Sequence, residues 1–386
     1  ALSGADASNY TVTDASNAQA NITVKQINAQ GVTASDKVYN ASTTATLDTS
    51  SAIISNGATS DADNLYYSTD TVLLEKGSAS GLFADKNVGS NKAVTVTGFA
   101  LSGADASNYT VTDASNATAD ITQLNTVSWT GLANDGLWSS VDNWTNGAIP
   151  DQSNVATAII DSFVTLDTDN VSTTSSITNN GTLLFSGARD VNFSSSIAGS
   201  GSLVKNNTNT LTLSGTNTYS GGTTINQGTL WATTLSGNNM TALGAIPSEF
   251  DADNIVISNG ANLKLGEDNS AARGLIRLDQ NQGIYLDTGM QTISKGDRKL
   301  IEIYGAISGP GGIIFDGGSN ESFRLYSANT YAGWTEITRN VDIHDVNAFQ
   351  NTTLNLINNG NSVGFAAPDS ETATYTFGGL SGSMTS

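Results

Sequence analysis

The sequence contains no cysteine, a single histidine and few charged residues. Without cysteine the chain cannot form a disulfide framework, a thiolate zinc site or a cysteine nucleophile. It has no apolar run of about 18 residues, the length needed for a helix that spans a membrane. Its 15 basic residues against 35 acidic ones give a formal net charge of −20. A polyanion repels nucleic acid and anionic lipid, because phosphate binding needs clustered lysine and arginine. We therefore expect neither nucleic-acid binding nor membrane insertion.

Two segments of the chain are nearly identical. Residues 1–23 reappear as residues 100–122, with differences only at Gln19 and Asn21 of the first copy. This repetition implies a tandem module of about 99 residues. We expect residues 24–123 to form one complete β module, and residues 1–23 to be the tail of a truncated module before it.

The complete module carries a family resemblance in four separated blocks. Its sequence closely resembles the YDG repeat of large bacterial surface exoproteins of the filamentous-haemagglutinin kind. The signature Tyr-Asp-Gly stands here as Tyr39-Asn40-Ala41, and asparagine tolerates turn geometry, so we expect the fold to persist. The four blocks are Gly31–Leu47, Gly81–Gly89, Lys92–Gly98 and Leu101–Tyr109.

A second repeat lies downstream. The sequence pattern of Ile197–Ile225 recurs in Ile307–Ile337, and a third copy starts at Leu380. Together with the closing Asn226–Leu230, the first copy resembles the autotransporter-associated β-strand repeat. The resemblance implies export through the outer membrane, either by two-partner secretion or as an autotransporter passenger. It places the protein outside the cell, at the bacterial cell surface.

Apolar residues in the second half alternate with polar ones over short runs. A period of two puts each apolar pair, such as Leu211/Leu213 and Phe323/Leu325, on one face of a strand. Repeated short strands with one apolar face favour a parallel β-helix, whose stacked coils share a continuous core. We predict an all-β rod in which the compact module is followed by a right-handed parallel β-helix over residues 151–386, with about ten coils of roughly 20–30 residues.

Three tryptophans gather in the junction at residues 124–150. Trp129, Trp138 and Trp144 could stack on sugar rings and form a glycan site. Such a cluster more commonly covers the open end of a β-helix, because it buries apolar surface that would otherwise face water. We predict that this Trp-rich segment is a cap.

Acidic pairs are the only candidate metal ligands. Asp61 and Asp63, and likewise Asp251 and Asp253, stand two residues apart beside an asparagine, and Ca²⁺ prefers such oxygen ligands. Neither an EF-hand loop nor a glycine-rich calcium repeat is present, and most such pairs are solvated turns. A Ca²⁺ site at these four residues is therefore a hypothesis, and no other cofactor is expected.

No catalytic constellation is recognisable. His344 has the opposite parity to the apolar Ile343, which predicts that it points to solvent. We find no nucleophile elbow, metalloprotease helix or phosphate loop. We therefore predict that the protein is not an enzyme.

These observations favour a structural stalk or passenger segment of a secreted adhesin. Contacts with host or environmental glycans and proteins would then lie in regions outside these residues. Two alternatives stay open, a self-assembling extracellular filament or biofilm-matrix protein and a polysaccharide-active β-helix enzyme. Stacking of open β-helix ends would favour the filament, and convergent acids in a groove would favour the enzyme.

Overall fold

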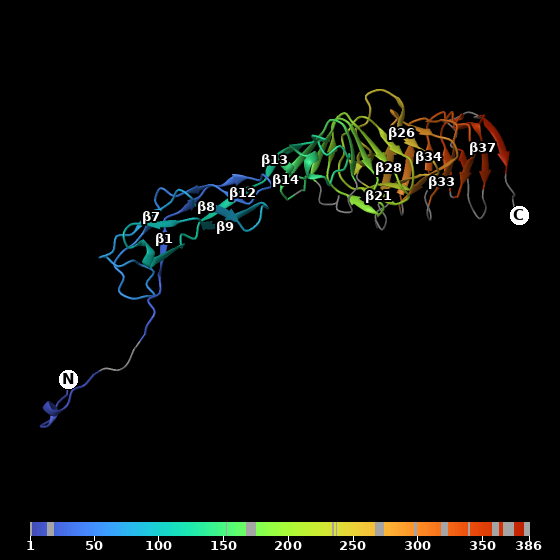
Figure 1. Cartoon of the computed structure of the whole chain (residues 1–386). Helices are drawn as coiled ribbons and strands as arrows, with labels where there is room; N and C mark the ends of the chain where they lie inside the picture. Colours follow the sequence, from blue (N-terminus) through green and yellow to red (C-terminus); the bar gives the residue numbers. More distant parts are fainter. Residues whose placement is uncertain are drawn as a thin grey trace. The chain divides into compact units, whose positions relative to one another are not determined.

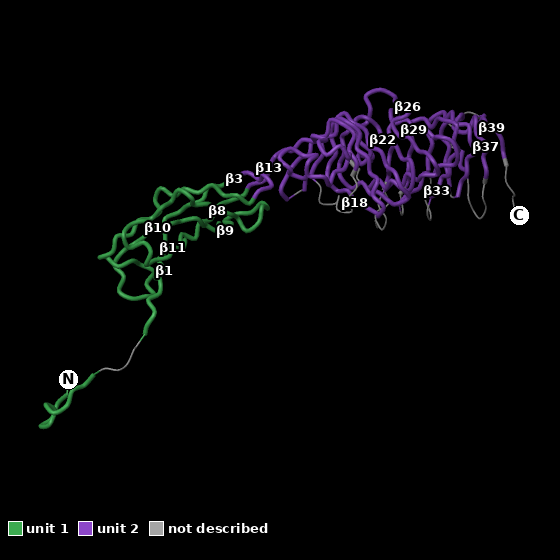
Figure 2. Tube along the Cα trace, in the orientation of Figure 1, with its two compact units in different colours: residues 1–37, 43–121 green, residues 38–42, 122–386 purple. Residues whose placement is uncertain are grey.

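The computed structural model forms two compact units, which Figure 2 colours separately. The first comprises residues 1–37 and 43–121, and the second residues 38–42 and 122–386. The predicted all-β class is confirmed, since no α-helix occurs in the part of the chain that the structure describes. Within that part, no helix has the length and apolar character needed to cross a membrane. The described residues are 2–13, 19–151, 153–166, 175–233, 235–236, 238–266, 274–296, 299–317, 323–338, 340–356, 363–365 and 374–381.

The first unit is built from strands that are short because Gly, Asn, Asp and Ser interrupt the apolar runs. Most of these strands pair in antiparallel fashion. Strand β8 pairs with β4 and β9, and β9 with β12, whereas β1 runs parallel to β11. The strands are β1 (Lys25–Gln30), β2 (Thr33–Ala34), β3 (Lys37–Val38), β4 (Thr44–Ala45), β5 (Leu47–Asp48), β6 (Ile53–Ile54), β7 (Leu73–Glu75), β8 (Ser80–Phe83), β9 (Gly89–Thr97), β10 (Ala100–Ser102), β11 (Tyr109–Asp113) and β12 (Thr118–Thr122).

A small apolar cluster holds this unit together. Ile27, Val72 and Tyr109 are buried against one another. The Tyr109 hydroxyl donates to Asp70 Oδ2 at 2.6 Å and accepts the Tyr67 backbone N–H at 3.1 Å. The polar end of this buried ring is therefore fully used.

The duplicated segments have the same local conformation. Each contains a 3₁₀ turn, η1 (Ala7–Asn9) and η2 (Ala106–Asn108), whose preceding aspartates have φ/ψ of −103°/8° and −107°/6°. Their environments differ, because Tyr10 is 70% exposed whereas its counterpart Tyr109 is 6% exposed. The local sequence thus sets the turn, and only the second copy has a partner surface.

The altered signature forms a turn as expected. The Asn40 side-chain oxygen accepts the Ser42 N–H at 3.2 Å. Ala41, which stands where the YDG signature has glycine, has a φ of 58°. A left-handed backbone suits glycine, so alanine is strained at this position.

The second unit is a parallel β-helix, as predicted. With two exceptions among the described strands, strands consecutive in the chain lie in different sheets, and each sheet is built mainly from parallel strands of successive coils. The coils follow one another in chain order along this unit (Figure 1). Hydrogen bonds between successive coils commonly join residues 20 apart. In the described part of this unit the longest sheet has nine strands, in agreement with about ten coils.

Four sheets make up the β-helix, and every pair is parallel except β24–β25. The first contains β13 (Leu124–Ser128), β14 (Val155–Ile160), β16 (Ser176–Asn179) and β19 (Ile197–Ala198). The second contains β15 (Phe163–Leu166), β17 (Thr182–Phe185), β20 (Ser202–Lys205), β22 (Thr223–Ile225), β26 (Asp251–Ile257), β29 (Gln282–Leu286) and β32 (Ile307–Ser308).

The third sheet carries the surface hollow described below. It contains β18 (Val191–Phe193), β21 (Thr210–Leu213), β23 (Thr229–Ala232), β27 (Asn262–Leu265), β30 (Met290–Lys295), β33 (Gly312–Asp316), β35 (Thr335–Ile337), β37 (Phe349–Leu356) and β39 (Phe377–Ser381). The fourth contains β24 (Leu235–Ser236), β25 (Asn239–Met240), β28 (Gly274–Leu278), β31 (Lys299–Ile303), β34 (Phe323–Leu325), β36 (Val341–Ile343) and β38 (Val363–Phe365). Three further 3₁₀ turns are η3 (Val141–Asn143), η4 (Thr145–Gly147) and η6 (Thr241–Leu243).

The alternating pattern fills the interior of the β-helix. Leu213 and Leu325, both predicted to be core residues, are 0% and 1% exposed. The pattern is wrong at Val191, which is only half-buried and lies at the edge of the third sheet. Phe193, two residues later, is fully buried as expected.

The two copies of the second repeat make the same contacts. Asn217 accepts the Ile197 N–H and donates to the next coil, and Asn329 does the same from Ile307. Tyr219 is buried with its hydroxyl bonded to a threonine, an arrangement repeated at the second copy's equivalent tyrosine. The repeated asparagine and tyrosine positions therefore form the same hydrogen bonds in both copies, and the asparagine bonds join one coil to the next.

Candidate functional site

The three junction tryptophans pack together at the first coils. The ring centroid of Trp144 lies 5.1 Å from that of Trp129 and 4.6 Å from that of Trp138, in edge-to-face geometry. Trp138 and Trp144 are buried, and the Trp138 backbone N–H donates to the carbonyl of Thr165 on β15. The buried rings of Trp138 and Trp144 cannot stack on a sugar, and Trp129 is half-buried, so this geometry favours the cap over a glycan site.

The first acidic pair lies in the β module of residues 24–123. The Asp63 carboxylate accepts the Lys25 ammonium at 2.8 Å and the backbone N–H groups of Thr59, Ser60 and Leu65. These donors, with Lys25 the strongest, hold the pKa of Asp63 well below its usual range. Asp61 accepts a long hydrogen bond of 3.4 Å from the Tyr67 hydroxyl. The carboxylate of Asp63 therefore closes a turn.

The second acidic pair, Asp251 and Asp253, opens β26 of the β-helix, far along the chain from the first. Asp251 accepts a hydrogen bond from the Asn254 amide at 3.3 Å. In the described part of the chain, no three His, Cys, Asp or Glu side chains gather in a way that could hold a metal ion. The Ca²⁺ hypothesis for both pairs stays a prediction.

His344 directly follows β36 and faces outward, on the opposite side from the buried Ile343, as its parity predicts. It is half-buried rather than freely solvated, because its ring stacks on Tyr326 at 4.3 Å, and Tyr326 stacks on Tyr304 at the same distance. Burial lowers the pKa of His344, and the nearby Arg324 lowers it further. This column ties three coils together.

Glu302 lies beside the tyrosine column and is nearly buried. Its carboxylate accepts from Arg277 at 2.9 Å, from Arg324 at 3.3 Å, and from the hydroxyls of Tyr304 and Tyr326. The pKa of Glu302 is lowered although burial opposes the shift, because these donors stabilise the carboxylate. Through these four donors, the Glu302 carboxylate links residues of neighbouring coils.

One lysine is buried in the interior-facing row of β20. Lys205 is 1% exposed, and its ammonium donates to the carbonyls of Asn206 and Asn207 and to Asn209 Oδ1. Burial lowers the pKa of Lys205 to about 8. The ammonium supplies donors to carbonyls at a corner of the coil, where the strand ladder supplies none.

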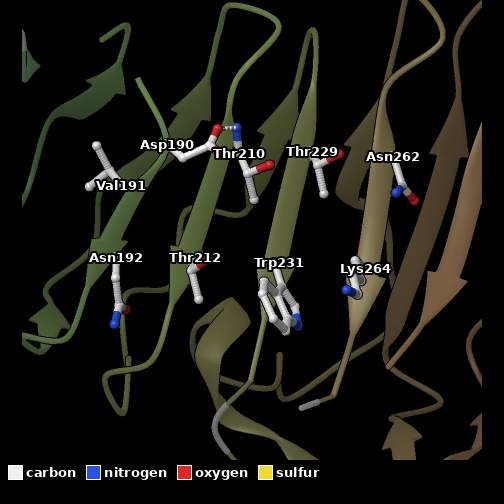
Figure 3. Close-up of a pocket in the computed structure, with 9 residues that line it drawn as sticks. All are labelled: Asp190, Val191, Asn192, Thr210, Thr212, Thr229, Trp231, Asn262 and Lys264. Carbon is white, nitrogen blue, oxygen red and sulfur yellow. Dashed lines mark hydrogen bonds between the residues drawn. The ribbon is translucent and has the colours of Figure 1, made fainter. Parts of the chain in front are cut away.

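The third sheet carries an open hollow of about 500 Å³ on its outer face (Figure 3). Two rows of side chains cross neighbouring strands there, in register from one coil to the next. The lining residues are Asp190, Val191, Asn192, Thr210, Thr212, Thr229, Trp231, Asn262 and Lys264. Hydroxyls and amides thus surround a single aromatic ring.

Sequence reasoning missed this hollow. Parity does turn Trp231 outward, because its neighbours Leu230 and Ala232 are buried. The pairing of Trp231 with Thr212 and Lys264 depends on coil lengths, which vary with the loops between strands. Alternation alone therefore could not bring these residues together.

Two family models match parts of the chain. The YDG domain matches residues 23–121, and the passenger-associated-transport-repeat matches residues 203–232. No curated protein and no solved structure gives a significant match. The repeat is typical of secreted or surface-exposed proteins, and it coincides with strands β20 to β23. Together the two matches support an autotransporter-type passenger.

Proposed function

We propose that the chain is a non-enzymatic stalk segment of a large secreted bacterial adhesin. This stalk would hold a recognition region, which lies outside these residues, at a distance from the cell. The recognition region could then reach host or environmental surfaces. The observation that carries this proposal is the repetition of contacts from coil to coil, seen at Asn217 and Asn329. Stacked coils supply length, and internal strand pairing satisfies the backbone.

The chemistry of the described side chains supports a structural role. A hydrolase needs an acid and a base positioned in one groove. Glu302 is held by two arginines and two tyrosines, and His344 is stacked on Tyr326. Both groups are engaged in joining coils.

A polysaccharide screen tests the non-enzymatic part of the proposal. The purified chain is incubated with pectin, chitin and host-type glycans, with and without Ca²⁺, and products are detected by mass spectrometry. We expect no cleavage product. Reproducible cleavage that is abolished by Asp251→Asn or by Glu302→Gln would replace the stalk with a β-helix enzyme.

Small-angle scattering tests the stalk part. A compact globular protein of 386 residues has a radius of gyration of about 21 Å. A stalk must exceed this value clearly at concentrations where the chain is monomeric. A measured radius near 21 Å would contradict the proposal.

Self-association is a second candidate function, favoured by residues 2–13. Leu2, Tyr10 and Val12 are 45%, 70% and 66% exposed, although the identical side chains of the second copy pack in the module. An exposed apolar segment of this kind can pair with another chain. Sedimentation of the chain and of its Tyr10→Asp variant tests this. Assembly that persists unchanged in the variant would exclude this segment as the contact.

A further inference from the structure

We propose that the hollow over β18, β21, β23 and β27 binds a neutral, linear glycan. Figure 3 shows its two rows, one from Thr210 through Thr229 to Asn262, the other from Asn192 to Lys264. Neighbouring strands are about 4.8 Å apart, and a hexose unit advances a glycan chain by a similar length. A chain laid across the strands therefore meets one pair of side chains at each sugar ring.

The aromatic surface of the hollow is held in place before any ligand binds. The Trp231 indole N–H donates to the Gly266 carbonyl at 2.5 Å, and the Lys264 ammonium lies 4.0 Å from the ring centroid. Sugar rings pack their C–H groups against aromatic faces, and because the Lys264 ammonium covers one face of the Trp231 ring, the sugar would pack against the opposite face. A fixed ring lowers the ordering cost of this contact.

The polar groups around the ring match sugar hydroxyls. Asn192 Oδ1 accepts the Ser214 hydroxyl at 2.7 Å, and Asn262 Oδ1 accepts the Ser294 hydroxyl at 2.8 Å, which orients both amides. Hydroxyl and amide groups both donate and accept, as sugar hydroxyls do. The surface is therefore suited to hydrogen bonding along a polyhydroxylated chain.

The charge of the protein selects neutral glycans over acidic ones. Lys264 lies at one edge of the hollow and Asp190 at the other, so the local charges offset each other. The whole chain carries a formal charge of −20, which repels sulfated and uronate-rich chains. A neutral hexose polymer meets no such repulsion.

Binding of defined oligosaccharides to the full chain tests this proposal. Cellohexaose, maltohexaose and mannohexaose are the neutral probes, a heparin hexasaccharide is the acidic probe, and titration calorimetry measures affinity. We expect at least one neutral probe to bind, and Trp231→Ala to weaken it about tenfold or more. Trp231→Phe should retain most of the affinity.

Trp334→Ala is the matched control. Trp334 precedes β35 in the same sheet, is 59% exposed and does not line the hollow, so its removal should leave binding unchanged. If Trp231→Ala lowers the melting temperature, Thr212→Val replaces it, with a several-fold weakening expected and the fold retained.

Three results would overturn the proposal. One is the absence of binding to all neutral probes, another is binding to heparin alone, and the third is equal weakening by the Trp231 and Trp334 variants. None of them bears on the stalk, which the scattering and cleavage measurements test separately.

Discussion

The β module of residues 24–123 and the β-helix use short strands in different ways. The module buries a small cluster around Ile27 and Tyr109, and ion pairs such as Lys25–Asp63 close its loops. In the β-helix, each interior strand pairs on both sides, and core residues such as Leu213 are fully buried. The difference teaches that a coil gains its core and its hydrogen bonds from its neighbours, whereas the module must supply both itself.

The tryptophans allow the two regions to be followed separately. All five lie in residues 122–386, so tryptophan fluorescence reports the β-helix and not the module. Each prediction below uses this separation to break or sharpen the comparison.

The largest effect is expected from emptying the core of the β-helix. Leu213→Ala should lower the free energy of unfolding by about 2–5 kcal/mol, because it leaves a cavity among rigidly paired strands. Urea unfolding followed by tryptophan fluorescence measures the loss. Ile27→Ala in the module is the control and should leave the tryptophan transition in place. A shift by Ile27→Ala as large as that by Leu213→Ala would show that the two regions unfold as one.

Lys205→Met should destabilise the β-helix by about 1–3 kcal/mol. The partner carbonyls of Asn206 and Asn207 stay in place and lose their donor. The same unfolding experiment measures the change at neutral pH. Unchanged or increased stability would mean that the desolvation of the ammonium outweighs its hydrogen bonds.

The same lysine predicts a pH dependence. Its folded pKa of about 8 lies below the unfolded value of 10.5, so the unfolded chain binds more protons between these values. The free energy of unfolding of the β-helix should therefore rise as the pH increases from about 8 to about 9.5. Lys205→Met should remove this rise, and a rise of the same size in the variant would assign it to another group.

A smaller effect of opposite sign is expected at the altered signature turn. Ala41→Gly should stabilise by about 0.5–1 kcal/mol, because glycine accepts the φ of 58° without strain. Thermal unfolding measures the change in stability, and hydrogen exchange of residues 37–47 locates it at the turn. Destabilisation would mean that the flexibility that glycine gives the unfolded chain outweighs the strain.

The smallest effect is expected at His344. Its ring is half-buried against Tyr326 on the outer face, and a surface substitution costs little. His344→Ala should change the free energy of unfolding by less than about 1 kcal/mol. A loss as large as that of Leu213→Ala would invert the assignment of inner and outer faces.

Alternation and repeats made much of this fold predictable. The period of two identified core positions such as Leu325. The repeat was visible in the sequence, whereas the buried hydroxyl contacts of Tyr219 and its second copy became visible only in the structure. The hollow was not predictable, because coil length decides that Trp231 lies beside Lys264. Lys205 was missed because an interior-facing position favours an apolar residue, and only the backbone at the corner explains the exception.

Hydrogen exchange of the intact chain tests most directly the claim that the β-helix is a cooperative stack suited to a stalk. Coils that share one core should open together, so amides of β20 to β33 should exchange slowest and at similar rates. Amides of the module should exchange faster, and those of residues 2–13 fastest. Coils that exchange one by one at widely different rates, or a module as protected as the β-helix, would contradict this account.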